Sequence, residues 1–375
     1  MSFRRLDDGG AEEPIGCAMP GPHAGRAGVA RGFMALALAA AMFAVPALAA
    51  PPGELAAKEA RHVAGTFPGR MAGTPKEDMA ARYLADRLLA MGYKPGLHRF
   101  FTSYTFNWAS KPERVHDDRT LISTNVIAER RGTSGKQIVV GAHYDTRIPR
   151  SERDLERNIG GPKLEGLDDN ASGTGVLLEL AQAFAKANPQ HTIKFIAFGA
   201  EEIGLKGAIE VVNRMSPTER AATLWMVNID SIVTGDRLYF HAGPKTYAKD
   251  PKAGHARDRA LAIAAGLGIS AATNPGLNSS YPIGTGCCSD QAAFDEAGIP
   301  VVNLEATNWE LGDKDGYQQT AVSKSFPDGY SWHLVDIDNR AHLEANLPPG
   351  RLEERARDAV RILVPLVSEL AGVKR

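Results

Sequence analysis

Between residues 137 and 230 the chain alternates short apolar runs with segments of helical spacing, and this alternation limits the fold more than any other feature. The apolar runs are 137–142 (QIVVGA), 192–200 (TIKFIAFGA) and 224–230 (LWMVNID), and the helical segments are 171–187 and about 205–214. Strands that alternate with helices are joined by right-handed crossovers and pair in parallel. The sequence therefore predicts an α/β fold with a mostly parallel central sheet and helices on both faces.

The rest of the chain after residue 50 extends this pattern. Helical spacing recurs at 77–91 and 349–370, and strand-like segments occupy 99–106 and 121–129. No change of composition between these elements indicates a domain boundary. We therefore expect residues 50–375 to form a single domain.

The N-terminal region differs in composition from everything that follows. Residues 33–45 (FMALALAAAMFAV) are uncharged and apolar, follow Arg26 and Arg31, and precede the small residues 47–49. This pattern is typical of a secretory signal peptide cleaved after Ala49, with an uncleaved N-terminal anchor as the alternative. We assign residues 1–49 to a signal peptide with a long N-terminal extension or a mis-assigned start codon, and expect a periplasmic or secreted protein. No later segment approaches the roughly 20 apolar residues that a membrane span needs, so no span is expected after signal cleavage.

Net charge and cysteine content set two further limits. A formal net charge of -1 with a pI near 6.8 gives no overall attraction to nucleic acid, so any charged ligand must be bound by a local site. After signal cleavage the chain would keep Cys287 and Cys288, which are adjacent. They are expected to form either a vicinal disulfide or two packed thiols.

Acidic and imidazole side chains follow each predicted core strand at its carboxyl end. His143 and Asp145 follow the first strand, Glu201 and Glu202 the second, and Asp230 the third, while Asp168, Asp169 and Asn170 precede the helix at 171. Singly, these residues also fit helix caps, a solvated turn or a histidine–carboxylate hydrogen bond. Because the carboxyl ends of parallel strands share one edge, however, we expect the side chains to converge.

A convergent set of acids needs a cation to offset the repulsion among them. A mixture of histidine and carboxylates favours zinc, whereas an all-oxygen set would favour magnesium or calcium. Five ligands with one bridging carboxylate suit a pair of ions better than a single one.

Successive motifs of the chain resemble those of the M28-type zinc aminopeptidases. They are PGRMAGTP (68–75), GAHYDT (141–146), GLDDNASGTGVLLELA (166–181), FGAEEIGLKGA (198–208), NIDSI (228–232) and SDQAAFDEAGIPVVNLEATNW (289–309). The segments 303–319 and 331–339 are most similar to bacterial alkaline phosphatase isozyme conversion aminopeptidases. The resemblance extends over about 61–370. It implies an α/β fold of the zinc exopeptidase type, with antiparallel edge strands beside the parallel centre.

The resemblance also implies roles for individual residues. His143 and Asp230 would hold one Zn²⁺, Glu202 and His333 the other, and Asp169 would bridge the two. Asp145 would orient the imidazole of His143, and Glu201 would be the catalytic acid–base. His342 is the alternative to His333, because the spacing from His333 to the following aspartates departs slightly from the common pattern.

The implied activity is that of a dinuclear zinc aminopeptidase acting on the N-termini of peptides or proteins, with arginine from an exported alkaline phosphatase among the residues removed. A glutaminyl-cyclase-like aminoacyltransferase with one zinc, a carboxypeptidase, and a binding domain without catalysis are the alternatives. Glu305, Asp313 and Asp315 are candidates for receiving a basic side chain and equally fit a solvated loop.

Overall fold

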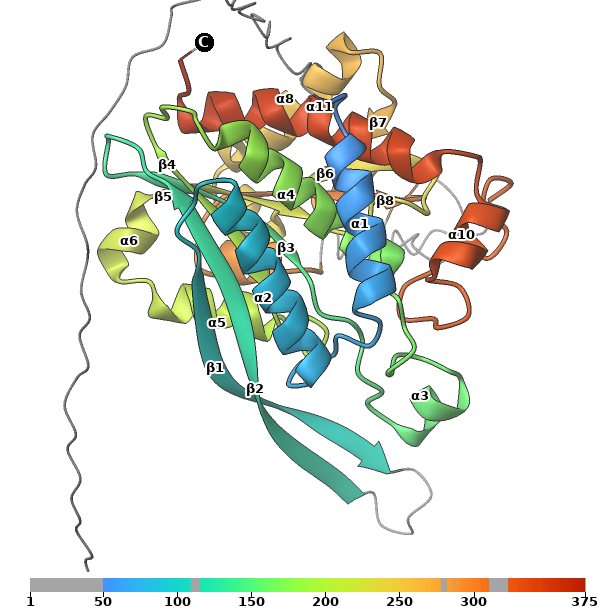
Figure 1. Ribbon diagram of the computed structural model, residues 1–375. Coiled ribbons are helices and arrows are strands. Elements are labelled where there is room, and N and C mark those ends of the chain that lie inside the picture. The colour runs from blue at the N-terminus through green and yellow to red at the C-terminus, as the bar shows by residue number, and fades with distance from the viewer. Residues whose placement is uncertain (1–49, 109–114, 278–281, 287, 310–322, 375) are drawn as a thin grey trace, which may run out of the picture. The chain divides into compact units, whose positions relative to one another are not determined.

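The computed structural model describes residues 50–108, 115–277, 282–286, 288–309 and 323–374 (Figure 1). The predicted signal peptide, residues 1–49, lies outside these ranges. The described strands form one sheet in the order β1-β2-β4-β3-β5-β8-β6-β7. Their bounds are β1 Gly96–Trp108, β2 Val115–Arg130, β3 Gln137–His143, β4 Thr192–Phe198, β5 Thr223–Ile229, β6 Arg237–Ala242, β7 Ala271–Ala272 and β8 Val301–Thr307.

The helices alternate with these strands along the chain. Their bounds are α1 Glu54–Thr66, α2 Pro75–Ala90, α3 Glu152–Glu156, α4 Gly173–Phe184, α5 Lys206–Arg214, α6 Pro217–Ala222, α7 Pro244–Lys249, α8 His255–Gly266, α9 Gln291–Glu296, α10 Arg340–Asn346 and α11 Arg351–Ala371. A short 3₁₀ turn, η2, covers Pro251–Gly254, and a π-type turn, η1, covers Leu167–Ser172.

The centre of the sheet is parallel, as the alternating sequence predicts. Strands β4, β3, β5 and β8 pair in parallel with one another. Strands β1 and β2 pair antiparallel at one side of the sheet and β6 joins β8 antiparallel at the other. The α/β fold with a mostly parallel centre and antiparallel strands toward its edges is therefore confirmed. In Figure 1 the β1–β2 hairpin extends well beyond the rest of the sheet.

Two apolar layers hold helices against the two faces of the sheet. Alternate residues of β3 point to opposite faces, because side chains alternate along a strand. Ile138 and Val140 pack into the larger layer with α1, α2, α4, α8 and α11, whereas Val139 packs into the smaller layer with α5 and α9. Burial on both faces explains why the central strands read as continuous apolar runs.

The predicted helix 171–187 begins and ends differently in the structure. α4 spans Gly173–Phe184, and the residues before it form the irregular turn η1, where Asp169 and Asn170 leave helical backbone angles. The backbone N–H groups of Asp168 and Asp169 donate to the carboxylate of Asp338 at 2.7 and 3.0 Å. A tertiary contact with Asp338, which local spacing does not predict, thus holds the segment before α4.

No helix within the described residues is long and apolar enough to cross a membrane.

Candidate metal centre

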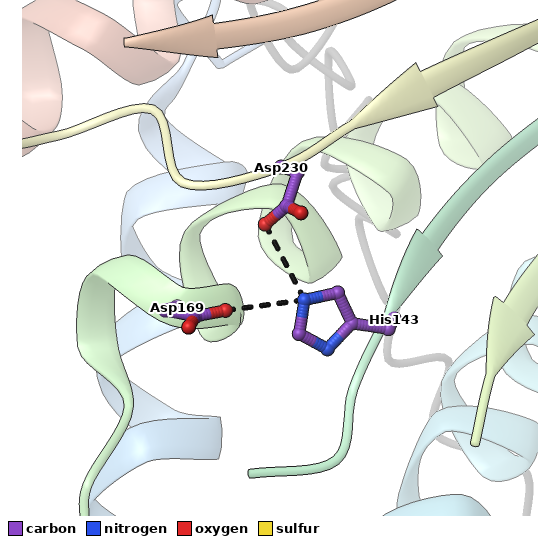
Figure 2. Close-up of side chains that lie close together, drawn as sticks. All are labelled: His143, Asp169 and Asp230. Atoms are coloured by element: carbon purple, nitrogen blue, oxygen red, sulfur yellow. Dashed lines mark hydrogen bonds and ion pairs between the residues drawn. The ribbon is translucent and has the colours of Figure 1, made fainter. Parts of the chain in front are cut away.

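The central strands bring the predicted ligands to one edge of the sheet. His143 is the last residue of β3, and Asp230 directly follows β5, the parallel neighbour of β3. Nε2 of His143 lies 3.3 Å from Oδ1 of Asp230 (Figure 2). We call these two residues the strand pair.

A second pair lies on the other side of Asp169. Glu202 comes from the turn after β4, and His333 from the segment between β8 and α10. Nε2 of His333 lies 3.0 Å from Oε2 of Glu202. We call these two residues the loop pair.

Asp169 faces both pairs with different oxygens. Its Oδ1 lies 3.1 Å from Nε2 of His143, and its Oδ2 lies 3.4 Å from Nε2 of His333. The five side chains form two groups, Asp169 with the strand pair and Asp169 with the loop pair, and within each group the candidate donor atoms lie within 4.8 Å of one another. A carboxylate with one oxygen toward each imidazole is placed to bridge two cations.

The turn that carries Glu201 and Glu202 is fixed by Asp145. The backbone N–H of Glu201 donates to Oδ1 of Asp145 at 3.0 Å, and that of Glu202 donates to Oδ2 at 3.3 Å. Oδ1 of Asp145 also lies 3.7 Å from Nδ1 of His143, which is longer than a hydrogen bond but close enough for an ionic contact. Asp145 therefore links the end of β3 to the turn after β4.

The pKa values of the two adjacent glutamates are shifted in opposite directions. Burial and the neighbouring charge of Glu202 raise the pKa of Glu201 well above its usual value, against the opposing effect of His143. Burial opposes ionisation of Glu202 too, but His333 and Arg147 outweigh it and lower the pKa of Glu202 to about 2. Glu201 is therefore disposed to take up a proton, and Glu202 to remain a charged ligand.

The pKa values of the two histidines and of the shared aspartate are all raised. Burial opposes the charged form of His143, but Asp230 and Glu201 raise its pKa well above the usual value. The pKa of His333 is likewise raised, because Glu202 outweighs burial. Burial and the charge of Glu202 raise the pKa of Asp169 to about 6.

The donor set fits zinc. Imidazole nitrogens and carboxylate oxygens are the mixture that Zn²⁺ binds in proteins. Oε1 of Glu202 is buried without a hydrogen-bond partner, although buried polar atoms normally have one. An oxygen of this kind beside an imidazole is available for a cation.

Left-handed backbone angles are concentrated at this edge of the sheet. Ala200 before the two glutamates, Ser231 after Asp230, and His333 itself have φ values of 57°, 47° and 65°. For residues other than glycine such angles cost on the order of 1–3 kcal/mol each, and they persist where the surrounding structure enforces them. The fold therefore bears a local backbone cost at the positions that orient the predicted ligands.

Three further residues hold the site together, and the sequence reasoning assigned this role to none of them. The buried guanidinium of Arg70 donates to the carbonyls of Tyr144, Glu165 and Gly166, which joins the end of β3 to the loop before Asp169. Asp338 receives the N–H groups around Asp169, as described above. Asp168 accepts from the Val233 N–H and from the hydroxyls of Thr234 and Ser331, so its carboxylate points away from the two pairs.

Other predicted candidates lie apart from the two groups. Nε2 of His342 lies 2.7 Å from Oδ2 of Asp328, away from the metal-facing side chains. Asp313 and Asp315 lie outside the described residues, and so does Cys287. Cys288 is disulfide-bonded.

A cavity opens over the two pairs. Its described lining comprises His143, Asp169, Glu201, Asp230, Ser231, Cys288, Ser289, Glu305, Trp332 and His333. Glu201 faces this cavity together with four of the five predicted ligands and Trp332, the neighbour of His333. A substrate bound there would meet the metal-facing side chains and Glu201 at once.

Comparisons with known proteins identify the family and the fold of the chain. Residues 125–347 match peptidase family M28. The chain is 47% identical over 320 residues to the alkaline phosphatase isozyme conversion protein of Escherichia coli strain K12, which covers 85% of this chain and 91% of that protein. Its fold is similar to that of a zinc aminopeptidase from Bacillus subtilis, with a TM-score of 0.62, 17% identity and coverage of 86% of this chain and 96% of the other. A glutaminyl cyclase from Porphyromonas gingivalis has the same fold, with a TM-score of 0.56, 18% identity and coverage of 85% and 98%. The chain therefore belongs to peptidase family M28 and is a zinc-dependent peptidase.

Proposed function

We propose that this peptidase is an exported aminopeptidase that binds two Zn²⁺ and removes single residues from the N-termini of peptides or proteins. The observation that carries the proposal is the position of Asp169, whose two oxygens face two different imidazoles 3.1 and 3.4 Å away. One ion would be held by the strand pair, the other by the loop pair, and both by Asp169. Two zinc ions would supply a water of lowered pKa and polarise the scissile carbonyl.

The remaining chemistry is assigned to residues of the chain. Glu201 lines the cavity, and its raised pKa suits a group that accepts a proton from water and passes it to the leaving amine. Asp145 positions Glu201 by accepting its backbone N–H. The carboxylates beside the two pairs would also attract the free α-ammonium group of a substrate, which favours cleavage at the N-terminus.

Substrate and location are parts of the same proposal. The name of the E. coli relative suggests an alkaline phosphatase as a protein substrate. The removal of arginine is the expectation that the sequence resemblance implies. The signal-peptide pattern of residues 33–49 supports export to the periplasm or the medium.

Metal content and a glutamate variant test the catalytic assignment. The purified mature protein should contain about two zinc ions per chain and hydrolyse aminoacyl peptides but not N-acetylated ones. Glu201→Gln should retain both ions and lose about 100- to 10,000-fold in kcat, as expected for a missing acid–base. Normal turnover by Glu201→Gln would exclude this residue as the proton carrier.

The fold similarity to a glutaminyl cyclase supports one competing activity. A single zinc ion per chain, together with pyroglutamate formation from N-terminal glutamine, would favour that reaction. Hydrolysis of N-blocked peptides from their C-termini would instead favour a carboxypeptidase.

A further inference from the structure

Glu305 adds a carboxylate to the cavity that neither predicted metal needs. It lies in β8, beside the end of β5: the N–H of Asp230 donates to the Leu304 carbonyl at 2.9 Å, and the N–H of Ala306 donates to the Ser231 carbonyl at 2.8 Å. Because neighbouring strands are about 4.8 Å apart, Glu305 lies one strand spacing from Asp230.

The side chain of Glu305 is on the same face of the sheet as that of Asp230. In parallel register Asn228 is opposite Asn303, and their side chains are joined by a 3.0 Å hydrogen bond. Two residues further along each strand lie Asp230 and Glu305, and residues two apart point to the same face. Both therefore line the cavity.

Two neutral donors fix the position of the Glu305 carboxylate. Nε1 of the buried Trp309 donates to Oε1 of Glu305 at 2.7 Å, and Nε2 of His241 lies 3.1 Å from the same oxygen. The backbone N–H of Asn274 donates to Nδ1 of His241 at 3.3 Å. Nδ1 therefore carries no proton, and the imidazole is a neutral donor through Nε2.

These contacts orient the negative charge without neutralising it. Both donors use Oε1, and within the described part of the chain no lysine or arginine forms an ion pair with Glu305. The residue is only 7% exposed, so water screens it weakly. A fixed carboxylate in a partly enclosed cavity favours a cationic ligand.

The position of Glu305 distinguishes two cationic groups of a substrate. An α-ammonium group is two bonds from the scissile carbonyl and must lie beside the metal-facing side chains. The carboxylate of Glu305 is held instead by His241 of β6, which lies on the side of β8 opposite β5 and Asp230. A charge at the end of a longer chain fits it better.

We propose that Glu305 selects substrates whose N-terminal residue carries a positively charged side chain, a guanidinium or an ammonium group. This inference rests on the proposed aminopeptidase function and assigns the residue that recognises the side chain. His241 and Trp309 are positioning residues that hold the carboxylate in place.

Citrulline provides a sharp test, because it has nearly the shape of arginine without the charge. The rates of hydrolysis of arginine, citrulline and leucine p-nitroanilides are compared for the wild-type protein and Glu305→Gln. The glutamine oxygen can still accept from Trp309 and His241, so the variant removes mainly the charge. We expect kcat/KM for the arginine substrate to fall by about 30- to 100-fold, the effect of breaking a desolvated charge pair, while the other two change little. Glu296→Gln, at an exposed position of α9, is the matched control and should alter none of the three.

Equal losses for all three substrates would overturn the assignment, because Glu305 would then act on a group that all of them share. Unchanged arginine hydrolysis, or a wild-type enzyme without preference for arginine over citrulline, would overturn it too while leaving the aminopeptidase function intact.

Binding gives a readout independent of turnover. In a Glu201→Gln background, calorimetry with L-argininamide and L-citrullinamide should show a preference for argininamide that Glu305→Gln removes. Hydrolysis of none of the three substrates would overturn the proposed function, and the calorimetric comparison would still decide the role of Glu305.

Discussion

The strand pair and the loop pair face the same carboxylate, but the fold positions them by different means. His143 ends a central strand and its side chain is 1% exposed, whereas the His333 side chain is 36% exposed. His333 belongs to the described segment 323–339, which contains no helix or strand. The strand pair lies where two parallel strands end, so the topology of the sheet fixes it. The loop pair depends on contacts between segments far apart in the chain.

Contacts with segments far away in the chain hold the His333 segment in place. The Gly160 N–H donates to the His333 carbonyl at 2.7 Å, and the Val335 N–H donates to the Asn158 carbonyl at 3.2 Å. The Asn158 amide donates to Oδ2 of Asp336 at 2.9 Å. Ligands held by such a loop lose more entropy on ordering than ligands on a packed strand. This difference indicates that two metal ions in one centre need not be bound with equal affinity. We expect the loop pair to bind zinc with lower affinity than the strand pair.

The largest effect is expected from the residue that the two pairs share. Asp169→Ala removes one ligand from each ion, so zinc content should fall below one per chain. The variant should also lose several kcal/mol of transition-state stabilisation, which corresponds to a fall of about 1,000-fold or more in kcat/KM. Elemental analysis and hydrolysis of an aminoacyl substrate measure both quantities.

Asp168→Asn is the adjacent control for this variant, because its carboxylate contacts Val233, Thr234 and Ser331 instead of the two pairs. We expect Asp168→Asn to lower the thermal stability of the protein and to change its zinc content little. Two zinc ions in Asp169→Ala would contradict the shared position of the carboxylate.

Separate loss of each histidine tests the expected inequality of the two pairs. His333→Ala should leave about one zinc per chain, bound by the strand pair as firmly as in the wild type. His143→Ala should leave about one zinc at the loop pair, bound about tenfold to 100-fold more weakly, which is the range seen when the support of a metal ligand is lost. Dialysis against increasing concentrations of a chelator measures how firmly each variant retains its zinc. Equal retention by the two variants would contradict the expectation that the loop pair binds zinc more weakly.

Zinc affinity should also depend on pH. His143 and His333 have raised pKa values and Asp169 has a pKa of about 6, so all three hold protons that zinc must displace. Affinity should therefore rise with pH, by about tenfold per pH unit for each proton displaced. The raised pKa values of the histidines extend this rise above the usual histidine range, and the proton of Asp169 adds to the slope only below about pH 6. Glu202, with a pKa of about 2, releases no proton above pH 4. Titrations with a competing chelator between pH 5 and 8 measure the slope, and a flat profile would contradict these protonation states.

The same contrast explains how much the sequence could predict. The strand-end positions of His143, Glu202 and Asp230 follow from the alternation of strands and helices, because the carboxyl ends of parallel strands share one edge. Asp169 and His333 followed from the resemblance to a family. Their convergence on the strand ends is a tertiary fact that local spacing does not contain.

Residues that act at long range were missed for that reason. Asp338 contacts Asp168 across 170 positions of the chain, and Arg70 contacts Gly166 across 96. Nothing in the residues next to Asp338 or Arg70 marks them as partners of the η1 turn. The position of Arg70 inside the motif 68–75 was a usable signal. Its burial, which points to a paired arginine, is visible only in the structure.

The smallest effect concerns the outermost tether of the loop pair. Asp336→Ala removes the acceptor of the Asn158 amide without changing the backbone preference of Asn158, whose φ is 54°. An exposed hydrogen bond contributes only about 1 kcal/mol, so the weaker zinc should be bound about fivefold less firmly and the tighter one unchanged. Asp118→Ala removes a comparable exposed hydrogen bond, from Thr105 in the β1–β2 hairpin, and should affect neither ion.

Equal release of zinc by the two variants would show that the hydrogen bond between Asn158 and Asp336 does not support the loop pair. Equally weaker binding of both ions in Asp336→Ala would show that the loop pair is not held independently of the strand pair. Only selective loss of one ion would show that the His333 segment is held in place separately from the strand ends.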